Sequence, residues 1–386
     1  MKQYQSISNR PPAHGRRGAI VVLFLFFMVI GVLMAALALN WSFLVLVQRD
    51  MQWRGQAIAL AAAPSLLDEA LLRDQTPDQS DDLIAAVTAA DLYRQLNNAT
   101  TGARLQLAAA DLLVDAGYVS DISTTIGPGN EFEPTEPYNT LRVQILRDSA
   151  GGNPVQPLVN GHWNADPVDV MATSYVTLDN RLVGWRPTAT SNAPLLPISV
   201  LAADWAARAV GGADNFPSPG GNDIYELQVR LDSSDPMAAD GNAAVVSLDP
   251  SQSVSFMKVL DQITDGAAIA DLAGGQFGPA TIASPLTVFA ESEAASQAST
   301  TALVVKLNEQ LGECRVLLLH QPSAAAGKVE IIGFAGVRIM EAVDEEGGGE
   351  HRLRLTVEPC FVVHHTAWTD PTAAENTWIH KLRVRR

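Results

Sequence analysis

Residues 19 to 47 form a run of 29 positions without one charged side chain, directly after Arg16 and Arg17. A helix of about 20 apolar residues is long enough to cross the ~30 Å hydrocarbon layer of a bilayer. Ala19 to Leu39 already supplies 21 residues before the first polar side chain, Asn40. The sequence therefore predicts a transmembrane helix over 19–47, with the lipid bilayer as a partner of the chain.

The charges on the two sides of this run predict its orientation. Cationic residues are retained on the cytoplasmic side, whereas long downstream domains are translocated whatever their own charge. Residues 1–18 carry +4 and no acidic side chain, so they are expected to form a cytoplasmic basic tail. The cations of this tail are Lys2, Arg10, Arg16 and Arg17. We therefore expect a single-pass protein of the bacterial inner (cytoplasmic) membrane, with its bulk periplasmic or extracellular.

The part of the chain after the tail is strongly acidic. The whole chain has a formal net charge of −16, so the residues that follow the +4 tail carry −20 together. A surface of this charge repels phosphate backbones. Nucleic acid is therefore excluded as an expected partner.

A cleaved secretory signal is the alternative to a retained anchor. Ala36-Leu37-Ala38 has the small-x-small form that signal peptidase accepts. The apolar core of a signal peptide spans only about 7 to 15 residues, however, and this run continues past the cleavage motif to Val47. Length favours retention of the anchor, while cleavage would release a secreted adhesin.

The helix is expected to continue beyond the membrane, because residues 48–63 contain no proline and are dominated by strong helix formers. Pro64 marks a kink or a restart of the helix. Apolar spacing then predicts further helices, the last over 105–116 with Gly117 as its C-terminal cap residue. We therefore expect a helical stalk region over 48–117.

Three short signals accompany the apolar run: Arg17-Gly18-Ala19 before it, Met51-Gln52 after it, and an alanine-rich end from Ala57 to Ala63. On these residues, the segment up to about residue 63 resembles the TadG-like N-terminal region of TadE/TadG-like proteins of Flp (tight adherence) pilus assembly. The resemblance implies a non-enzymatic, membrane-anchored structural component of pilus assembly or secretion. Its implied partners are other membrane or pilus-assembly proteins. Asn40 and Gln56 depart from the family, which commonly carries acidic residues at both positions. An ordinary signal anchor is the alternative interpretation.

From residue 118 the pattern changes to short β-type runs separated by Gly, Pro, Asn and Asp. Residues 118–386 are numerous enough for two structural units, and a loop-rich boundary between them is expected near 208–223. The predicted fold class is therefore α+β: a long N-terminal transmembrane helix that continues into a helical stalk, followed by a mainly antiparallel β ectodomain over 118–386. The strongest candidate strands form a final group: 302–307, 315–319, 329–343, 352–357 and 378–384.

Small side chains within the apolar run are candidates for contact with other membrane helices. Small residues let helix backbones approach closely in lipid, and polar side chains can hydrogen-bond between helices. Burial of the same residues against lipid near the interface is the alternative. The candidates for membrane helix packing are Gly31, Ala35, Ala36, Ala38 and Asn40.

The two cysteines of the chain, Cys314 and Cys360, both fall in the final β group. An oxidising compartment would allow them to form a disulfide that encloses 45 residues. Location on opposite faces of a sheet, or simple burial as free thiols, is the alternative. The C-x-x-C spacing of thiol redox enzymes is absent.

Motifs for catalysis or cofactor binding are absent from the sequence. There is no HExxH or GxSxG, and the glycine-rich segment 211–223 lacks the lysine of a phosphate-binding loop, so no catalytic residue, nucleotide or other cofactor is predicted. The acidic run 344–350 lacks the spaced ligands of a calcium loop and is interpreted as a hairpin tip without metal. The rival interpretation is a tethered extracytoplasmic enzyme or ligand-binding module that uses acidic loops as its site.

Overall fold

The computed structural model describes most of the chain, and every structural statement below concerns these residues. The described ranges are 16–73, 79–99, 106–159, 166–211, 215–216, 224–231, 242–249, 255–278, 286–291, 297–322, 328–347 and 350–385. The fold combines one long apolar N-terminal helix with a strand-rich C-terminal region in which antiparallel pairing prevails, an α+β mixture.

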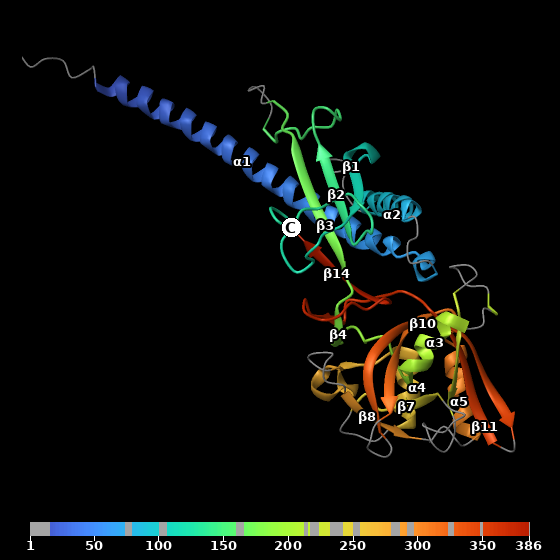
Figure 1. Cartoon of the computed structure of the whole chain (residues 1–386). Helices are drawn as coiled ribbons and strands as arrows, with labels where there is room; N and C mark the ends of the chain where they lie inside the picture. The colour runs from blue at the N-terminus through green and yellow to red at the C-terminus, as the bar shows by residue number, and fades with distance from the viewer. Residues whose placement is uncertain are drawn as a thin grey trace, which may run out of the picture.

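Helix α1 (Arg16–Ala62) is continuous for 47 residues, as expected for a segment that lacks proline and is rich in strong helix formers. Its N-terminal half extends away from the rest of the molecule (Figure 1). Helix α1 ends where Pro64 enters the first turn of the short 3-10 helix η1 (Ala63–Leu66). The predicted continuation of the helix beyond the apolar run is therefore confirmed.

The C-terminal half of α1 packs on a five-stranded sheet, which we call the first sheet. Its strand order is β1-β2-β3-β14-β12. The strands are β1 (Leu112–Gly117), β2 (Thr140–Arg147), β3 (Val170–Asp179), β14 (Ile379–Arg385) and β12 (Val362–Val363). Helix α2 (Ser80–Ala99) also contacts α1, and the short 3-10 helices η2 (Glu69–Leu72) and η4 (Ala109–Asp111) complete this region.

The side chains of each strand point alternately to the two faces of the first sheet, and α1 packs on the face that carries the apolar ones. Leu141 and Val143 on β2 lie in one buried cluster with Ile58 and Ala62 of α1, because successive strand residues point to opposite faces. On the other face, Arg142 pairs with Asp115 at 2.6 Å and lies over the Phe132 ring. The C-terminal half of α1 is thus a core helix of this layer.

The second sheet contains seven strands in the order β11-β6-β7-β5-β9-β10-β8, and it closes on itself because β10 also pairs with β11. Its strands are β5 (Leu195–Leu201), β6 (Leu227–Leu231), β7 (Ala243–Val246), β8 (Leu286–Glu291), β9 (Cys314–Pro322), β10 (Lys328–Gly347) and β11 (Glu350–Pro359). Helices α3 (Ala202–Gly211), α4 (Phe256–Asp265) and α5 (Gln297–Asn308) accompany it.

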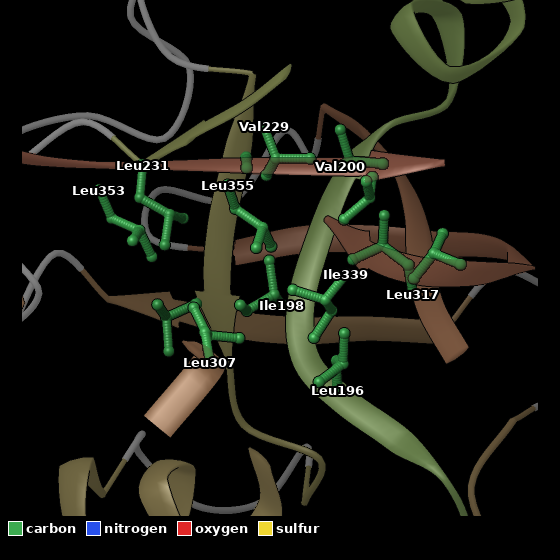
Figure 2. Packing of buried hydrophobic residues seen from close by; sticks show 14 of the residues in the cluster. Leu196, Ile198, Val200, Val229, Leu231, Leu307, Leu317, Ile339, Leu353 and Leu355 are labelled. Atoms are coloured by element: carbon green, nitrogen blue, oxygen red, sulfur yellow. The ribbon is translucent and has the colours of Figure 1, made fainter. Parts of the chain in front are cut away.

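Branched aliphatic side chains fill the core of the second sheet. Figure 2 shows Ile198, Ile339 and Leu355 converging from three strands, with Leu307 of α5 against the same cluster. These residues are fully buried. At roughly 1.5 to 3 kcal/mol for each buried large aliphatic side chain, such a core is a main source of stability for the strand-rich C-terminal region.

The two sheets are connected by chain segments that cross between them twice. Strand β4 (Leu182–Trp185) follows β3 and pairs with β13 (Ala367–Thr369) in a small two-stranded sheet. The chain then returns through β14, which pairs antiparallel with β3 of the first sheet. Strand β14 therefore belongs to the same layer as the C-terminal half of α1.

Three predictions about local structure are corrected by the structure. The segment predicted as a third stalk helix contains a strand, β1, which pairs with β2, so the helical stalk does not extend to residue 117. Residues 302–307, predicted as a strand, lie in α5. The expected boundary at 208–223 does not separate two units, because β5 before it and β6 after it belong to the same sheet.

Candidate functional site

Helix α1 changes its surroundings at Asn40. Between Ile20 and Leu39 the large apolar side chains are mostly exposed, whereas an amphipathic pattern of burial begins after Asn40. Exposed apolar side chains over this length are typical of a membrane-facing helix, since water would oppose their exposure. One described helix, α1, is long and apolar enough to cross a membrane.

Asn40 is held by the loop that connects β2 to β3. The Val159 N–H donates to Asn40 Oδ1 at 2.8 Å, and Asn40 Nδ2 donates to the Val159 carbonyl at 3.4 Å. Asn40 and Val159 lie 119 residues apart in the chain. Asn40 therefore makes a contact within the chain, and its predicted role in contacts between membrane helices stays a prediction.

The residues just after Asn40 pack on protein along one face. Val47 and Met51 are buried in a cluster with Ile145 and Val155, and Phe43 packs against the same cluster. The opposite face keeps Trp41 and Leu46 exposed. One face of residues 40–47, within the predicted transmembrane segment 19–47, is therefore covered by residues of β2, β3 and the loop between them. The bounds of the transmembrane segment stay a prediction.

The small residues of the apolar run divide between two faces of α1. At 100° per residue, Gly31, Ala35 and Ala38 share one face, whereas Ala36 lies on the same side as Asn40. A Cβ on Gly31 would meet nothing within 4 Å. The face that carries Gly31, which we call the Gly31 face, is therefore accessible, and Ala36 lies on a different side of the helix. The predicted packing of these residues against another membrane helix stays a prediction.

The topology residues lie at or before the start of α1. Arg16 and Arg17 are its first two residues. Lys2 and Arg10 lie outside the described residues.

We expect Asn40→Leu to lower the free energy of unfolding of the ectodomain by about 1 kcal/mol, because the change deletes both hydrogen bonds to Val159 at a half-buried position. The measurement is urea unfolding of the full chain in detergent micelles. Ser42→Leu, an exposed polar residue two positions further on, is the control and should leave the midpoint unchanged. Equal midpoints for the two variants would contradict the assignment.

A second candidate site joins η2, in the segment after α1, to the second sheet near the two cysteines. Cys314 faces Arg338 across the β9–β10 pair, and the Cys360 N–H donates to the Gly336 carbonyl at 3.1 Å. A Cβ at Gly336 would lie 2.3 Å from the Cys360 carbonyl oxygen, so glycine permits this approach. Both cysteines are free thiols: Cys360 is buried in a hydrophobic cluster, and Cys314 is partly buried and packs against the same cluster. Their predicted disulfide stays a prediction.

The two thiols differ in their electrostatic surroundings. Contact with the Cys360 thiol lowers the pKa of Cys314, and the neighbouring Arg338 guanidinium acts in the same direction against burial. Burial raises the pKa of Cys360 well above its usual value. A thiol with a lowered pKa beside a second thiol is the arrangement that favours oxidation to a disulfide.

Arg338 links this region to the segment that follows α1. Its Nη1 donates to Glu69 of η2 at 3.0 Å and also pairs with Glu358. Burial raises the pKa of Glu358, and the hydrogen bond from Arg338 opposes that shift. We call Glu69, Arg338 and Glu358 the triad. No local sequence pattern predicts it, because Glu69 lies 269 positions from Arg338.

We expect Arg338→Met to destabilise the chain by about 3 kcal/mol, because Glu358, with 1% exposure, would keep a buried charge without its partner. Urea unfolding provides the measurement. Arg230→Met, at an exposed site on β6, is the matched control and should change little. The double variant Arg338→Met/Glu358→Gln should recover part of the loss, since it removes the stranded charge. If Arg338→Met were as stable as Arg230→Met, the triad would not contribute to the free energy of unfolding.

The cavities among the described residues include the following two. One of about 320 Å³ is lined mainly by apolar residues of β4, β9 and β10, with Glu375 as its charged lining residue. The other, of about 470 Å³, lies between α1 and the β2–β3 loop and includes Arg147 in its lining. Within the described ranges, no group of three or more His, Cys, Asp or Glu side chains could hold a metal ion.

Comparisons with protein-family models, with curated proteins and with solved structures found no match for this chain.

Proposed function

We propose that this chain is a single-pass structural protein of the bacterial inner membrane, with residues 1–18 in the cytoplasm and an acidic, non-enzymatic ectodomain outside. It is proposed to act in the assembly or anchoring of a surface pilus or secretion apparatus, beside other membrane or pilus-assembly proteins. The N-terminal resemblance to TadG-like proteins of Flp pilus assembly supports the assembly role. The positive tail supports the orientation.

The observation that carries the proposal is the division of α1 at Asn40. Residues 20–39 present apolar side chains without a covering protein surface, and the following residues of the same helix form the core of the first sheet. A rigid continuous helix transmits the position of the membrane directly to the ectodomain. This is the construction expected of a structural anchor.

The exposed Gly31 face suits lateral association with another membrane helix. Gly31, Ala35 and Ala38 present little side-chain bulk on this face, and close backbone approach stabilises helix pairs in lipid. The partner helix in this proposal belongs to another assembly protein.

Membrane fractionation tests the anchoring part of the proposal. The full-length protein should stay in the membrane pellet after alkaline carbonate extraction and should be released by detergent. N-terminal sequencing of the mature protein tests the secreted alternative. A mature form that begins at Leu39 would replace the anchor by a released adhesin.

Copurification tests the assembly part. Crosslinking in intact cells through a photoreactive residue at position 35, on the small-residue face, should trap a second membrane protein encoded with pilus or secretion components. The same probe at position 37, on a different face of the helix, is the control. Crosslinks to lipid alone at both positions would contradict the proposed association.

A further inference from the structure

The membrane-proximal end of the ectodomain is formed by residues 154–159, which we call the rim loop. This loop lies between β2 and β3, at one end of the first sheet (Figure 1). The two hydrogen bonds between Asn40 and Val159 fix it beside α1. Its height relative to the helix is therefore determined by the fold.

The length of the exposed part of α1 places the rim loop at a definite depth. Residues 20–39 comprise 20 helical residues, and a rise of 1.5 Å per residue gives about 30 Å. That length matches the hydrocarbon layer of a bilayer, ~30 Å. If residues 20–39 span this layer, Asn40 and Val159 lie at the boundary between the hydrocarbon and the headgroups.

The side chains at this level have the character of a membrane interface. Trp41 is 72% exposed, and Leu158 at the tip of the rim loop is 49% exposed. Tryptophan is enriched at the headgroup level, where an apolar ring with one N–H donor is stable. Water would be a poor environment for both groups, so a lipid surface is the occupant that their chemistry favours.

The cavity beside the rim loop adds a cation at the headgroup level. Phe43 and Val47 line it, and they lie three and seven residues beyond Asn40, or about 4.5 and 10.5 Å along the helix, so the cavity begins within the headgroup layer and extends past it. The headgroup layer on each side is roughly 5 to 7 Å thick. Arg147, whose Nη2 donates to Asn153 Oδ1 at 2.6 Å, is the charged residue in this lining. An arginine at this height suits the phosphate of a phospholipid.

We propose that the rim loop, together with Trp41 and Arg147, docks on the headgroup layer of a phospholipid bilayer and fixes the height of the ectodomain above the membrane. The inference rests on the proposed function, because it requires α1 to span the bilayer. It adds a second, peripheral contact with lipid, made by a loop far from the anchor in sequence.

Spin-label depth measurements test the inference on the full chain. The protein, with Cys314→Ser and Cys360→Ser, is reconstituted into phosphatidylethanolamine–phosphatidylglycerol vesicles and labelled at Leu158→Cys. We expect the label to show a higher collision ratio of oxygen to a water-soluble nickel reagent than a label at Leu311→Cys. Leu311 is the matched control, since it is an apolar residue with 47% exposure in the distal part of the ectodomain.

Two further labels distinguish the failure modes. Gln156→Cys, on the same loop, should report a depth close to that of Leu158→Cys and guards against local misfolding of one variant. A label at Val29→Cys reports on the anchor itself. If Val29 is in lipid while both loop labels match Leu311, the docking is overturned and the anchor stands. If the Val29 label is in water, both proposals fail.

Discussion

The double variant Val29→Arg/Val32→Arg is expected to lose stable membrane insertion. Both valines are exposed near the middle of the 20–39 segment, and one arginine at the centre of a membrane helix costs about 2.5 to 3.5 kcal/mol on insertion scales. Two would therefore cost about 5 to 7 kcal/mol. A large fraction of the protein should fail to insert. The fraction resistant to carbonate extraction is the quantity to measure.

The control for this experiment places the same two charges on the ectodomain. Val305 of α5 and Met257 of α4 are also exposed apolar residues, so Met257→Arg/Val305→Arg changes the net charge equally. This control should extract like the unmodified protein. If the helix variant also remained in the carbonate-resistant pellet, the assignment of 20–39 as the spanning segment would be wrong.

Oxidation of Cys314 and Cys360 to a disulfide is expected to raise the free energy of unfolding by about 4 kcal/mol. The two cysteines belong to the same packed cluster, with Cys360 buried and Cys314 against it. The link would enclose 45 residues, and the chain-entropy model gives a stabilisation of this size for such a loop. The two thiols lose two electrons and two protons when the bond forms. Glutathione disulfide accepts them and is reduced to two glutathione molecules.

Urea unfolding of the full chain in detergent, with oxidised and with reduced glutathione, measures this effect. The oxidised protein should show the higher midpoint, and mass spectrometry should show the loss of two hydrogens. The variant Cys314→Ser/Cys360→Ser is the control, and its midpoint should not depend on the redox buffer. An oxidised protein with the midpoint of the reduced one would refute the stabilising role.

Local sequence patterns predicted the long helix because its signal is strong and continuous. Twenty-one residues without a polar side chain indicate a membrane helix, and the absence of proline up to residue 63 indicates its extension. The hairpin of β10 and β11 was also predictable. The acidic, glycine-rich run 344–350 is too polar for a buried element, and it joins two segments in which apolar and polar residues alternate. Its last register pair is Gly347 with Glu350.

The errors occurred where tertiary packing outweighed local preference. The run Ala302 to Leu307 contains adjacent valines and was predicted as a strand, yet Leu303 and Leu307 lie one helical turn apart and both enter the core of the second sheet. Conversely, the leucine-rich segment Leu112 to Gly117 suits a helix by composition. It forms a strand because β2 offers a hydrogen-bonding edge.

The candidate sites depended on contacts that no local pattern contains. Asn40 was predictable as the end of the apolar run, but its partner Val159 comes from a distant loop. The proximity of the cysteines could be proposed from their number and their shared β group. Their neighbour Arg338, and its link to Glu69, required the folded arrangement.

The most direct test of the central claim is two-sided labelling of single cysteines in spheroplasts with a membrane-impermeant maleimide. Ser6→Cys reports on the tail and Lys306→Cys on α5, each in the Cys314→Ser/Cys360→Ser background. Position 306 should be labelled in intact spheroplasts, and position 6 only after lysis. Labelling of position 6 in intact spheroplasts, or labelling of position 306 only after lysis, would contradict an anchor with its ectodomain outside.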